Sequence, residues 1–215
     1  MEHIQLTPEN VAVCAAKAAE VLRAGGVVLY PTDTLHGLGA DAFSNTAVDM
    51  IYQIKGRDEG KPIHAIVSDL DMAGQFGEVG DEASALVQKF GGKLTVVVKK
   101  RPELNTGIAR DIATFGFRVP DNEFCIALAK AFGRPITATS ANKSGEKPVR
   151  SVEKILAQFG SGASRIDLVI DAGELPEREP SSVVDFSTGE QTILREGSIS
   201  AASLGPLLAR GTTRR

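Results

Sequence analysis

Short apolar runs alternate with longer stretches of helical periodicity along most of the chain. Val11, Ala15 and Leu22 recur at helical spacing, and the glycine pair at 25–26 ends the predicted helix. The apolar residues 27–30 that follow predict a strand buried on both faces. The same two patterns predict helices at 44–54, 81–90, 121–132, 151–159 and 201–209, and strands at 63–67, 94–98, 115–119, from 136, and at 168–170, 183–185 and 192–194.

This alternation of helices and strands predicts an α/β fold. The last strands are joined by short loops, so we expect a mixed sheet rather than an all-parallel one. Repeats, low-complexity linkers and composition breaks are not seen in the sequence. We therefore expect one domain over residues 1–215, with 209–215 as a frayed tail.

Composition narrows the class of protein. Of the 215 residues, 42% are hydrophobic and 24% charged, which is typical of soluble globular proteins. The net charge of −3 argues against a non-specific nucleic-acid coat. Cys14 and Cys125 lack metal-ligand spacing and fall on apolar helical faces, which favours buried free thiols in a reducing cytoplasm. The first residues lack signal-peptide features, and no apolar run reaches membrane-helix length.

Polar segments that follow apolar strands are the candidate sites of chemistry. The first, residues 30–39, carries the hydroxyls of Thr32 and Thr34, and its Gly37 and Gly39 would let a ligand approach the backbone closely. An ordinary turn is an equally good interpretation. The spacing around Gly37 fits a dinucleotide fingerprint poorly.

Cations form the second and third candidates. Lys55, Arg57 and Lys61 lie within seven residues and would suit a phosphate chain, although cations at a helix end also favour the helix dipole. Arg118 comes late in a hydrophobic strand, where burial requires an anionic partner. That partner can be a structural or a substrate carboxylate.

The fourth candidate, residues 139–145, offers hydroxyls, an amide and backbone N–H groups that suit phosphates or a base, or else forms a surface loop. The three histidines, His3, His36 and His64, form no evident catalytic triad. His64 alternates with apolar residues, which favours a structural position. The sequence indicates no covalent nucleophile.

Taken together, these segments resemble the YrdC/TsaC family of threonylcarbamoyl-adenylate synthases. The matching motifs are, in family order, Gly25 to Gly39, Lys55-Gly-Arg57, Lys61-Pro62, Leu94-Thr95, Arg118-Val-Pro120, Thr139-Ser-Ala-Asn142-x-Ser-Gly145, Pro180 to Asp185 and Leu194 to Gly197. The resemblance implies a twisted mixed sheet flanked by helices, with a concave cation-lined cavity. The chain looks like the short form, without a C-terminal domain.

The resemblance also implies a nucleotidyltransferase reaction. Threonine and bicarbonate would give a carbamate, which attacks the α-phosphate of ATP and releases pyrophosphate, with Mg²⁺ expected beside ATP. The product would pass to a tRNA threonylcarbamoyl transferase for the t6A modification, with direct tRNA contact secondary. The implied ATP-binding residues are Lys55, Arg57, Lys61, Thr114, Ala138, Ser140, Asn142, Val149 and Arg195, and the implied threonine-binding residues are Thr34, Arg118 and Ser181.

The chain departs from the family pattern at three places. Phe90-Gly-Gly-Lys93 stands where members usually have Trp-Pro-Gly-Pro, and Asn122 stands where many have a histidine. Some members place a threonine-contacting histidine where this chain has Ile66, while His64 lies two residues earlier on the same strand face. Threonine selectivity is the property that these departures affect.

Two other functions remain open from the sequence. One is an RNA- or tRNA-binding module of the same fold, against which the net charge argues. The other is a paralogue with diverged carbamoyl-transfer activity, against which the retained Ser140-Ala-Asn142 segment argues.

Overall fold

The computed structural model describes residues 1–58 and 61–208. The strands are β1 (Glu2–Gln5), β2 (Val28–Pro31), β3 (His36–Gly39), β4 (His64–Ile66), β5 (Leu94–Lys99), β6 (Thr114–Arg118), β7 (Ile136–Ser140), β8 (Leu168–Asp171), β9 (Ser182–Asp185) and β10 (Thr192–Arg195). The α-helices are α1 (Val11–Arg23), α2 (Asn45–Lys55), α3 (Leu70–Phe76), α4 (Asp81–Phe90), α5 (Glu123–Phe132), α6 (Val152–Phe159) and α7 (Ala201–Leu204). Short 3₁₀ turns at Pro8–Asn10, Gly91–Lys93, Gly107–Ala109, Gly160–Arg165 and Gly205–Leu207 complete the description.

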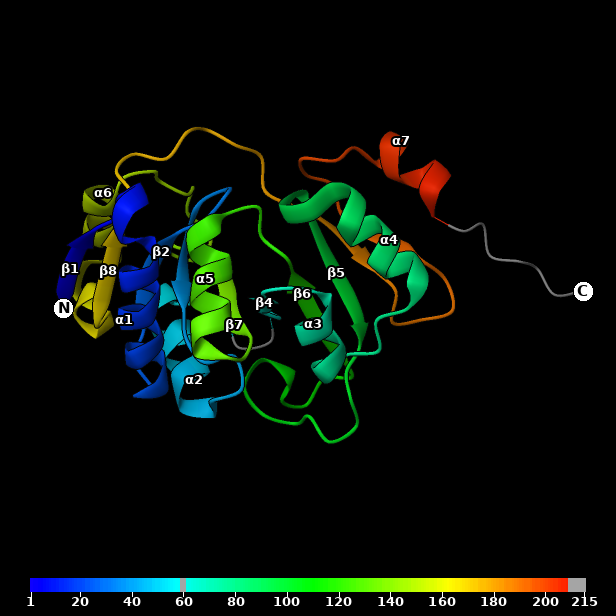
Figure 1. Cartoon of the computed structure of the whole chain (residues 1–215), viewed down its shortest axis with the longest axis horizontal. Helices are drawn as coiled ribbons and strands as arrows, with labels where there is room; N and C mark the ends of the chain where they lie inside the picture. The colour runs from blue at the N-terminus through cyan, green and yellow to red at the C-terminus, as the bar shows by residue number, and fades with distance from the viewer. Residues whose placement is uncertain (59–60, 209–215) are drawn as a thin grey trace, which may run out of the picture.

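The strands form one twisted sheet in the order β1-β8-β2-β3-β7-β4-β6-β5-β9-β10. β1, β8 and β2 run parallel, as do β4 with β6 and β5 with β9, while the remaining neighbours pair antiparallel. The predicted mixed α/β fold is therefore confirmed. The continuity of this sheet along the molecule (Figure 1) favours the one-domain prediction, which stays a prediction.

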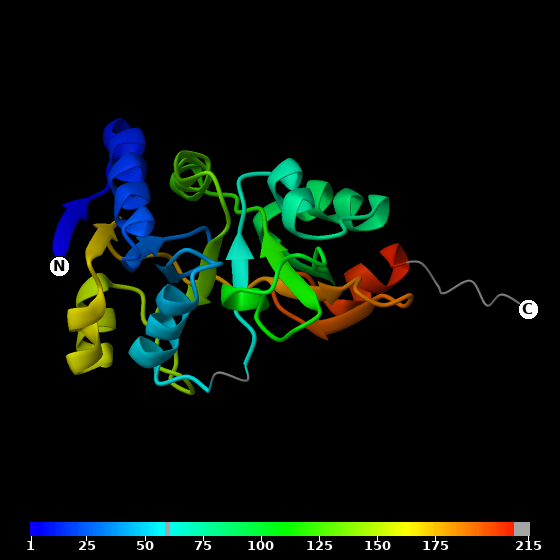
Figure 2. The same cartoon turned by 90° about the horizontal axis from the view of Figure 1, so that it is seen from below.

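Helices cover both faces of the sheet. α1 and α5 pack against each other on one face, which α3 and α4 also cover farther along, while α2 and α6 lie on the opposite face (Figure 2). The small buried residues of α1, Ala15, Ala18 and Ala19, let it approach its neighbours closely. The core under α1 and α5 includes Tyr30 and Ile66, which are both fully buried.

One long connection crosses the width of the sheet. It joins β8, the second strand in the order, to β9, the ninth, through residues 172–181 without helix or strand (Figure 1). Its contacts with the rest of the fold include the Leu175 N–H, which donates to the Arg150 carbonyl at 3.1 Å, and Arg178 Nη1, which donates to the Asp33 carbonyl at 2.8 Å. We call residues 172–181 the crossing segment.

Most predicted elements are present, with ends shifted by a residue or two. Ser44 and Ser151, where two of the predicted helices begin, cap α2 and α6. The cap of α5 is Asn122, one residue after the predicted start at 121, and its Oδ1 accepts from the Cys125 N–H at 2.9 Å. The sequence patterns did not predict β1, β3 or α3. The predicted helix at 201–209 becomes α7 and a 3₁₀ turn, and its last residue and the predicted tail 209–215 lie outside the described residues. Both cysteines are buried free thiols, as predicted.

Candidate active site

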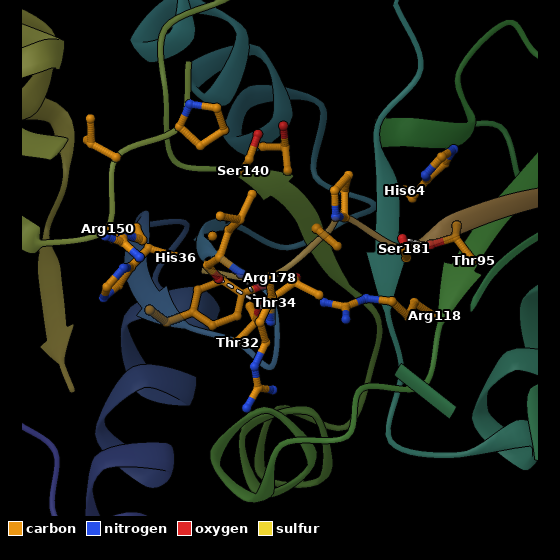
Figure 3. A pocket seen from close by; sticks show the side chains of 18 of the residues that line it. Thr32, Thr34, His36, His64, Thr95, Arg118, Ser140, Arg150, Arg178 and Ser181 are labelled. Atoms are coloured by element: carbon orange, nitrogen blue, oxygen red, sulfur yellow. Dashed lines mark hydrogen bonds between the residues drawn. The ribbon is translucent and has the colours of Figure 1, made fainter. Parts of the chain in front are cut away.

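A cavity of about 760 Å³ is lined by residues from both halves of the sheet (Figure 3). The β2–β3 connection, β4 and β7 border it, as do the ends of β5, β6 and β10 and the crossing segment. Among the residues that the structure describes, seven cationic side chains and two carboxylates line it: Arg57, Arg118, Lys147, Arg150, Lys154, Arg178 and Arg195 against Glu174 and Glu177. A cavity of this size and charge suits a small anionic ligand.

Arg118 lies at one end of the cavity, and its side chain is 7% exposed. Its Nη1 donates to Asp33 Oδ1 at 2.5 Å and to the Gly92 carbonyl at 3.0 Å. Asp33 Oδ2 accepts from the Asp121 N–H at 3.1 Å. Asp33 therefore neutralises the buried guanidinium, which the sequence analysis required but did not assign. Within residues 1–58 and 61–208 only Nη1 has hydrogen bonds, so the other nitrogens of Arg118 are available to a ligand.

Gly92 makes room for the Asp33 carboxylate. A Cβ at this position would lie 1.8 Å from Asp33 Oδ2 and 2.6 Å from the backbone nitrogen of Asp121. Any side chain there would displace the carboxylate and with it the Arg118 pair. The Phe90-Gly-Gly-Lys93 segment therefore keeps a glycine at the position where the ion pair needs one.

Hydroxyl groups lie beside Arg118 at the same end. Ser181 Oγ is 2.8 Å from Thr95 Oγ1, and Thr34 Oγ1 is 3.2 Å from Thr32 Oγ1. Arg195 Nη2 donates to the Ser181 carbonyl at 2.7 Å, which fixes the guanidinium at the cavity wall. Burial and the charge of Arg118 lower the Arg195 pKa. This end therefore combines cations with neutral hydrogen-bonding groups.

Lys55 does not line the cavity but supports the loop that does. It is 2% exposed, and its Nζ donates to the Asn142 carbonyl at 2.7 Å and to the Ser140 carbonyl. The Lys55 carbonyl in turn accepts from the Ser144 N–H at 2.9 Å. Burial, with a contribution from Arg57, lowers the Lys55 pKa to about 7. Lys55 thus positions the segment that follows β7.

His64 supplies an imidazole to the cavity wall, whereas Ile66 is buried in the core below α1 and α5. Gly116 on β6 leaves space for the ring, since a Cβ there would lie 2.4 Å from His64 Cδ2. Burial, then the charges of Arg195 and Arg57, lower the His64 pKa to about 4. His64 is therefore neutral at physiological pH.

His36 also lines the cavity, yet it is only 1% exposed. Its Nδ1 and Nε2 have no hydrogen-bond partner within the described part of the chain. Burial lowers its pKa to about 4, and only the Asp171 charge opposes this shift. His36 lies within the candidate segment 30–39, which was selected for its hydroxyls and glycines and not for this histidine.

The structure brings together most of the residues that the family resemblance selected. Eight of the twelve line the cavity: Thr34, Arg57, Arg118, Ala138, Ser140, Val149, Ser181 and Arg195. The other four do not: Lys55, Lys61, Thr114 and Asn142. The eight come from segments far apart in sequence, which converge because the sheet order interleaves strands from both ends of the chain.

Three of the four other residues have positions that explain their exclusion. Lys61 is exposed, and its backbone carbonyl accepts from Tyr52 Oη at 3.1 Å. Thr114 pairs with Lys99 at the end of β6 opposite Arg118, which gives no support to a nucleotide contact in this cavity. Asn142 Nδ2 donates to the carbonyls of its own loop, those of Lys143 at 2.9 Å and Glu146 at 2.7 Å.

Sequence reasoning missed several cavity residues. Arg150 and Arg178 come from segments without a strand or helix, so no periodicity marks them. Arg150 pairs with Glu174 at 3.6 Å and with Glu177 at 3.9 Å, which holds the crossing segment over the cavity. For Asp33, a signal did exist, because a buried Arg118 needs a carboxylate and Asp33 lies in a polar segment already selected.

Comparison with known proteins gives a consistent result. A Sua5/YciO/YrdC family model, described as "Telomere recombination", matches residues 20–197. The chain is 36% identical to a threonylcarbamoyl-AMP synthase of Mus musculus over 89% of this chain and 70% of that protein. It is 33% identical to a putative threonylcarbamoyl-AMP synthase of Methanocaldococcus jannaschii over 81% of both.

A solved structure agrees with this comparison. P. abyssi Sua5 complexed with L-threonine superimposes with a TM-score of 0.84 at 28% identity, covering 96% of this chain. The chain spans 60% of that Sua5 chain. No helix within the described residues is long and apolar enough to cross a membrane. By its sequence, its fold and the relatives it matches, the chain belongs to the Sua5/YciO/YrdC family.

Proposed function

We propose that this chain is an L-threonylcarbamoyladenylate synthase, which condenses L-threonine, bicarbonate and ATP to threonylcarbamoyl-AMP and pyrophosphate. The observation that carries this proposal is one cation-rich cavity with Arg118 at one end and the Ser140 loop at the other. Relatives matched over most of the chain carry the name of this activity. P. abyssi Sua5, which shares the fold, has been solved with L-threonine.

Threonine would bind at the Arg118 end. The unpaired nitrogens of Arg118 can take the amino-acid carboxylate, since Asp33 occupies only Nη1. Thr34 and Ser181 provide hydroxyls for the polar groups of the substrate, and both line the cavity. The Ser181 hydroxyl is oriented by Thr95 at 2.8 Å.

ATP would occupy the rest of the cavity. Arg57 and Arg195 suit the phosphates because both guanidinium groups line the cavity. Ala138, Ser140 and Val149 line the region where the nucleoside would lie. The further predicted ATP residues, Lys55, Lys61, Thr114 and Asn142, do not line the cavity; for Lys55 and Asn142 we propose positioning of the 140–146 loop.

The proposed reaction needs alignment more than covalent catalysis. The threonine ammonium loses a proton, and the free amine attacks bicarbonate carbon to give a carbamate and water. A carbamate oxygen then attacks the α-phosphorus of ATP, and pyrophosphate leaves. Cations at the cavity wall would stabilise the negative charge on the phosphates throughout. The neutral His64 lies among these cations without adding to their charge at neutral pH.

Mg²⁺ is expected to accompany ATP in this reaction. Among the described residues no group of three or more His, Cys, Asp or Glu side chains could hold a metal ion. We propose that any Mg²⁺ enters as the nucleotide complex, and we assign no step to it.

The acyl-adenylate product is a mixed anhydride that water hydrolyses. We propose that it passes to a tRNA threonylcarbamoyl transferase, and that the chain works in the cytoplasm, where tRNA is modified. Direct tRNA contact is a secondary possibility that the net charge of −3 does not favour.

The test is pyrophosphate release from ATP with each substrate left out in turn. We expect release only when threonine and bicarbonate are both present, together with a product of the mass of threonylcarbamoyl-AMP. Release that is indifferent to threonine contradicts the proposal. Salt-sensitive RNA binding without ATP turnover would point to a binding module instead.

A further inference from the structure

His36 is the buried polar side chain that the proposed chemistry leaves unused. It begins β3, lines the cavity and is 1% exposed. Neither ring nitrogen has a hydrogen-bond partner within residues 1–58 and 61–208. Buried polar groups are nearly always hydrogen-bonded, so a group left in this state at a cavity wall calls for a partner from outside the chain, a ligand atom or water.

The backbone holds this ring in place. His36 pairs with Pro31 on β2, and its carbonyl accepts from the Ala141 N–H at 2.8 Å. The next residue, Gly37, pairs with Ser140 on β7. Because the His36 backbone is fixed between two strands and its side chain is 1% exposed, the ring stays in the cavity wall. Its partner must therefore come to it.

The ring is a neutral donor and acceptor. Burial lowers the His36 pKa to about 4, so at neutral pH one nitrogen carries hydrogen and the other accepts. The accepting nitrogen would face phosphate oxygens unfavourably, because both are acceptors. Hydroxyl groups and the ring edges of a base, which both donate and accept, match the imidazole better.

The position of His36 in the cavity favours the nucleoside of ATP over threonine as its ligand. His36 lies toward Arg150, away from Arg118 and Ser181 (Figure 3), and its backbone bonds to the loop that follows β7. Ser140 and Val149 line that end of the cavity, and the nucleoside is proposed to lie beside them. The threonine carboxylate, in contrast, belongs at the Arg118 end.

We propose that His36 is a further nucleotide-binding residue, whose imidazole hydrogen-bonds to a neutral edge of the nucleoside, on the base or the ribose, and not to the phosphates. This inference rests on the proposed function for the placement of ATP. It assigns to His36 a binding contribution that is independent of the cations at the wall.

The experiment compares calorimetric binding of adenosine, ATP and inorganic tripolyphosphate to the wild-type chain and to His36→Phe. Loss of one ligand hydrogen bond should weaken adenosine and ATP alike, by about 3- to 10-fold. Tripolyphosphate should bind both proteins equally. Without ligand, His36→Phe should melt at an equal or higher temperature, because it removes two unpaired buried nitrogens. His36→Asn, which keeps a donor and an acceptor, should regain part of the adenosine affinity.

The matched control is His3→Phe, since His3 lies on β1 with its side chain 48% exposed and pairs with Asp171 outside the cavity. It should leave all three affinities unchanged. If adenosine binds His36→Phe as tightly as the wild type, the inference is wrong, and the ring bonds only to water. An equal loss of affinity for tripolyphosphate also overturns the inference. If His36→Phe does not fold, His36→Leu replaces it.

The two proposals fail separately. If the wild-type chain releases pyrophosphate only with threonine, but His36→Phe binds adenosine as tightly as the wild type, the inference about His36 alone is wrong. If adenosine binding depends on His36, but pyrophosphate release does not depend on threonine, the proposed reaction alone is wrong.

Discussion

The buried pair of Arg118 and Asp33 gives the sharpest stability prediction. We consider Asp33→Asn, which keeps the shape of the side chain and removes its charge. The side chains are 7% and 6% exposed, so the change leaves a buried guanidinium without its counter-ion. Breaking such a pair costs about 3–5 kcal/mol. The amide oxygen can still accept one hydrogen bond from Arg118, which favours the lower end, about 3 kcal/mol.

Urea unfolding of four proteins measures this effect: the wild type, Asp33→Asn, Arg118→Met and the double variant. Each single variant leaves one buried charge alone, whereas the double variant leaves none. We expect the double variant to lose far less than the sum of the singles, with a coupling of about 2–3 kcal/mol. Additive losses, or a loss below about 1 kcal/mol for Asp33→Asn, would refute the buried ion pair.

Threonine provides a second measurement on the same variant. If its carboxylate contacts Arg118, it supplies the missing counter-ion in Asp33→Asn. Saturating threonine should then raise the melting temperature of Asp33→Asn more than that of the wild type. An equal rise in both proteins would mean that threonine binds away from Arg118.

The remaining predictions concern single residues. Arg118→Ala should raise the KM for threonine far more than the KM for ATP in pyrophosphate-release kinetics, and equal effects would remove the assignment. Lys55→Met should raise the KM for ATP and lower the free energy of unfolding by about 1–3 kcal/mol, because two loop carbonyls lose their donor. Unchanged hydrogen exchange in the 140–146 loop would count against this role. Gly92→Ala should abolish threonine binding by calorimetry, since its Cβ would meet Asp33 Oδ2 at 1.8 Å. The His36 pKa falls from 6.5 to about 4 on folding, so the unfolded chain takes up the proton first as the pH is lowered. This group should therefore lower the free energy of unfolding by about 2 kcal/mol between pH 7 and pH 5. Urea unfolding of His36→Phe should lack that part of the drop.

Periodicity predicted most of the fold because apolar strands and amphipathic helices carry local signals. It failed for β3, since residues 36–39 read His-Gly-Leu-Gly and have little strand propensity of their own. This strand forms because it pairs on both sides, with β2 and β7. It failed for β1 because the strand is short, mostly exposed and held by β8 from the far end of the chain.

The site was predictable where a motif carried it. Arg118 and Ser140 are the last residues of β6 and β7 and belong to recognisable motifs, and both line the cavity. The sequence could not separate residues that face the cavity from residues that support it. Lys55 is the clearest case, because only the fold shows its ammonium turned toward the loop carbonyls instead of the cavity. His36 was overlooked because a missing partner is visible only in three dimensions.

The proposed reaction requires that one cavity hold an amino acid against the α-phosphorus of a nucleotide. A crystal structure of the chain with threonine and a non-hydrolysable ATP analogue tests it most directly. We expect the threonine carboxylate on Arg118, the nucleoside beside His36 and Ser140, and the threonine nitrogen turned toward the α-phosphate. Threonine and nucleotide in separate sites, or a carboxylate that does not touch Arg118, would contradict it.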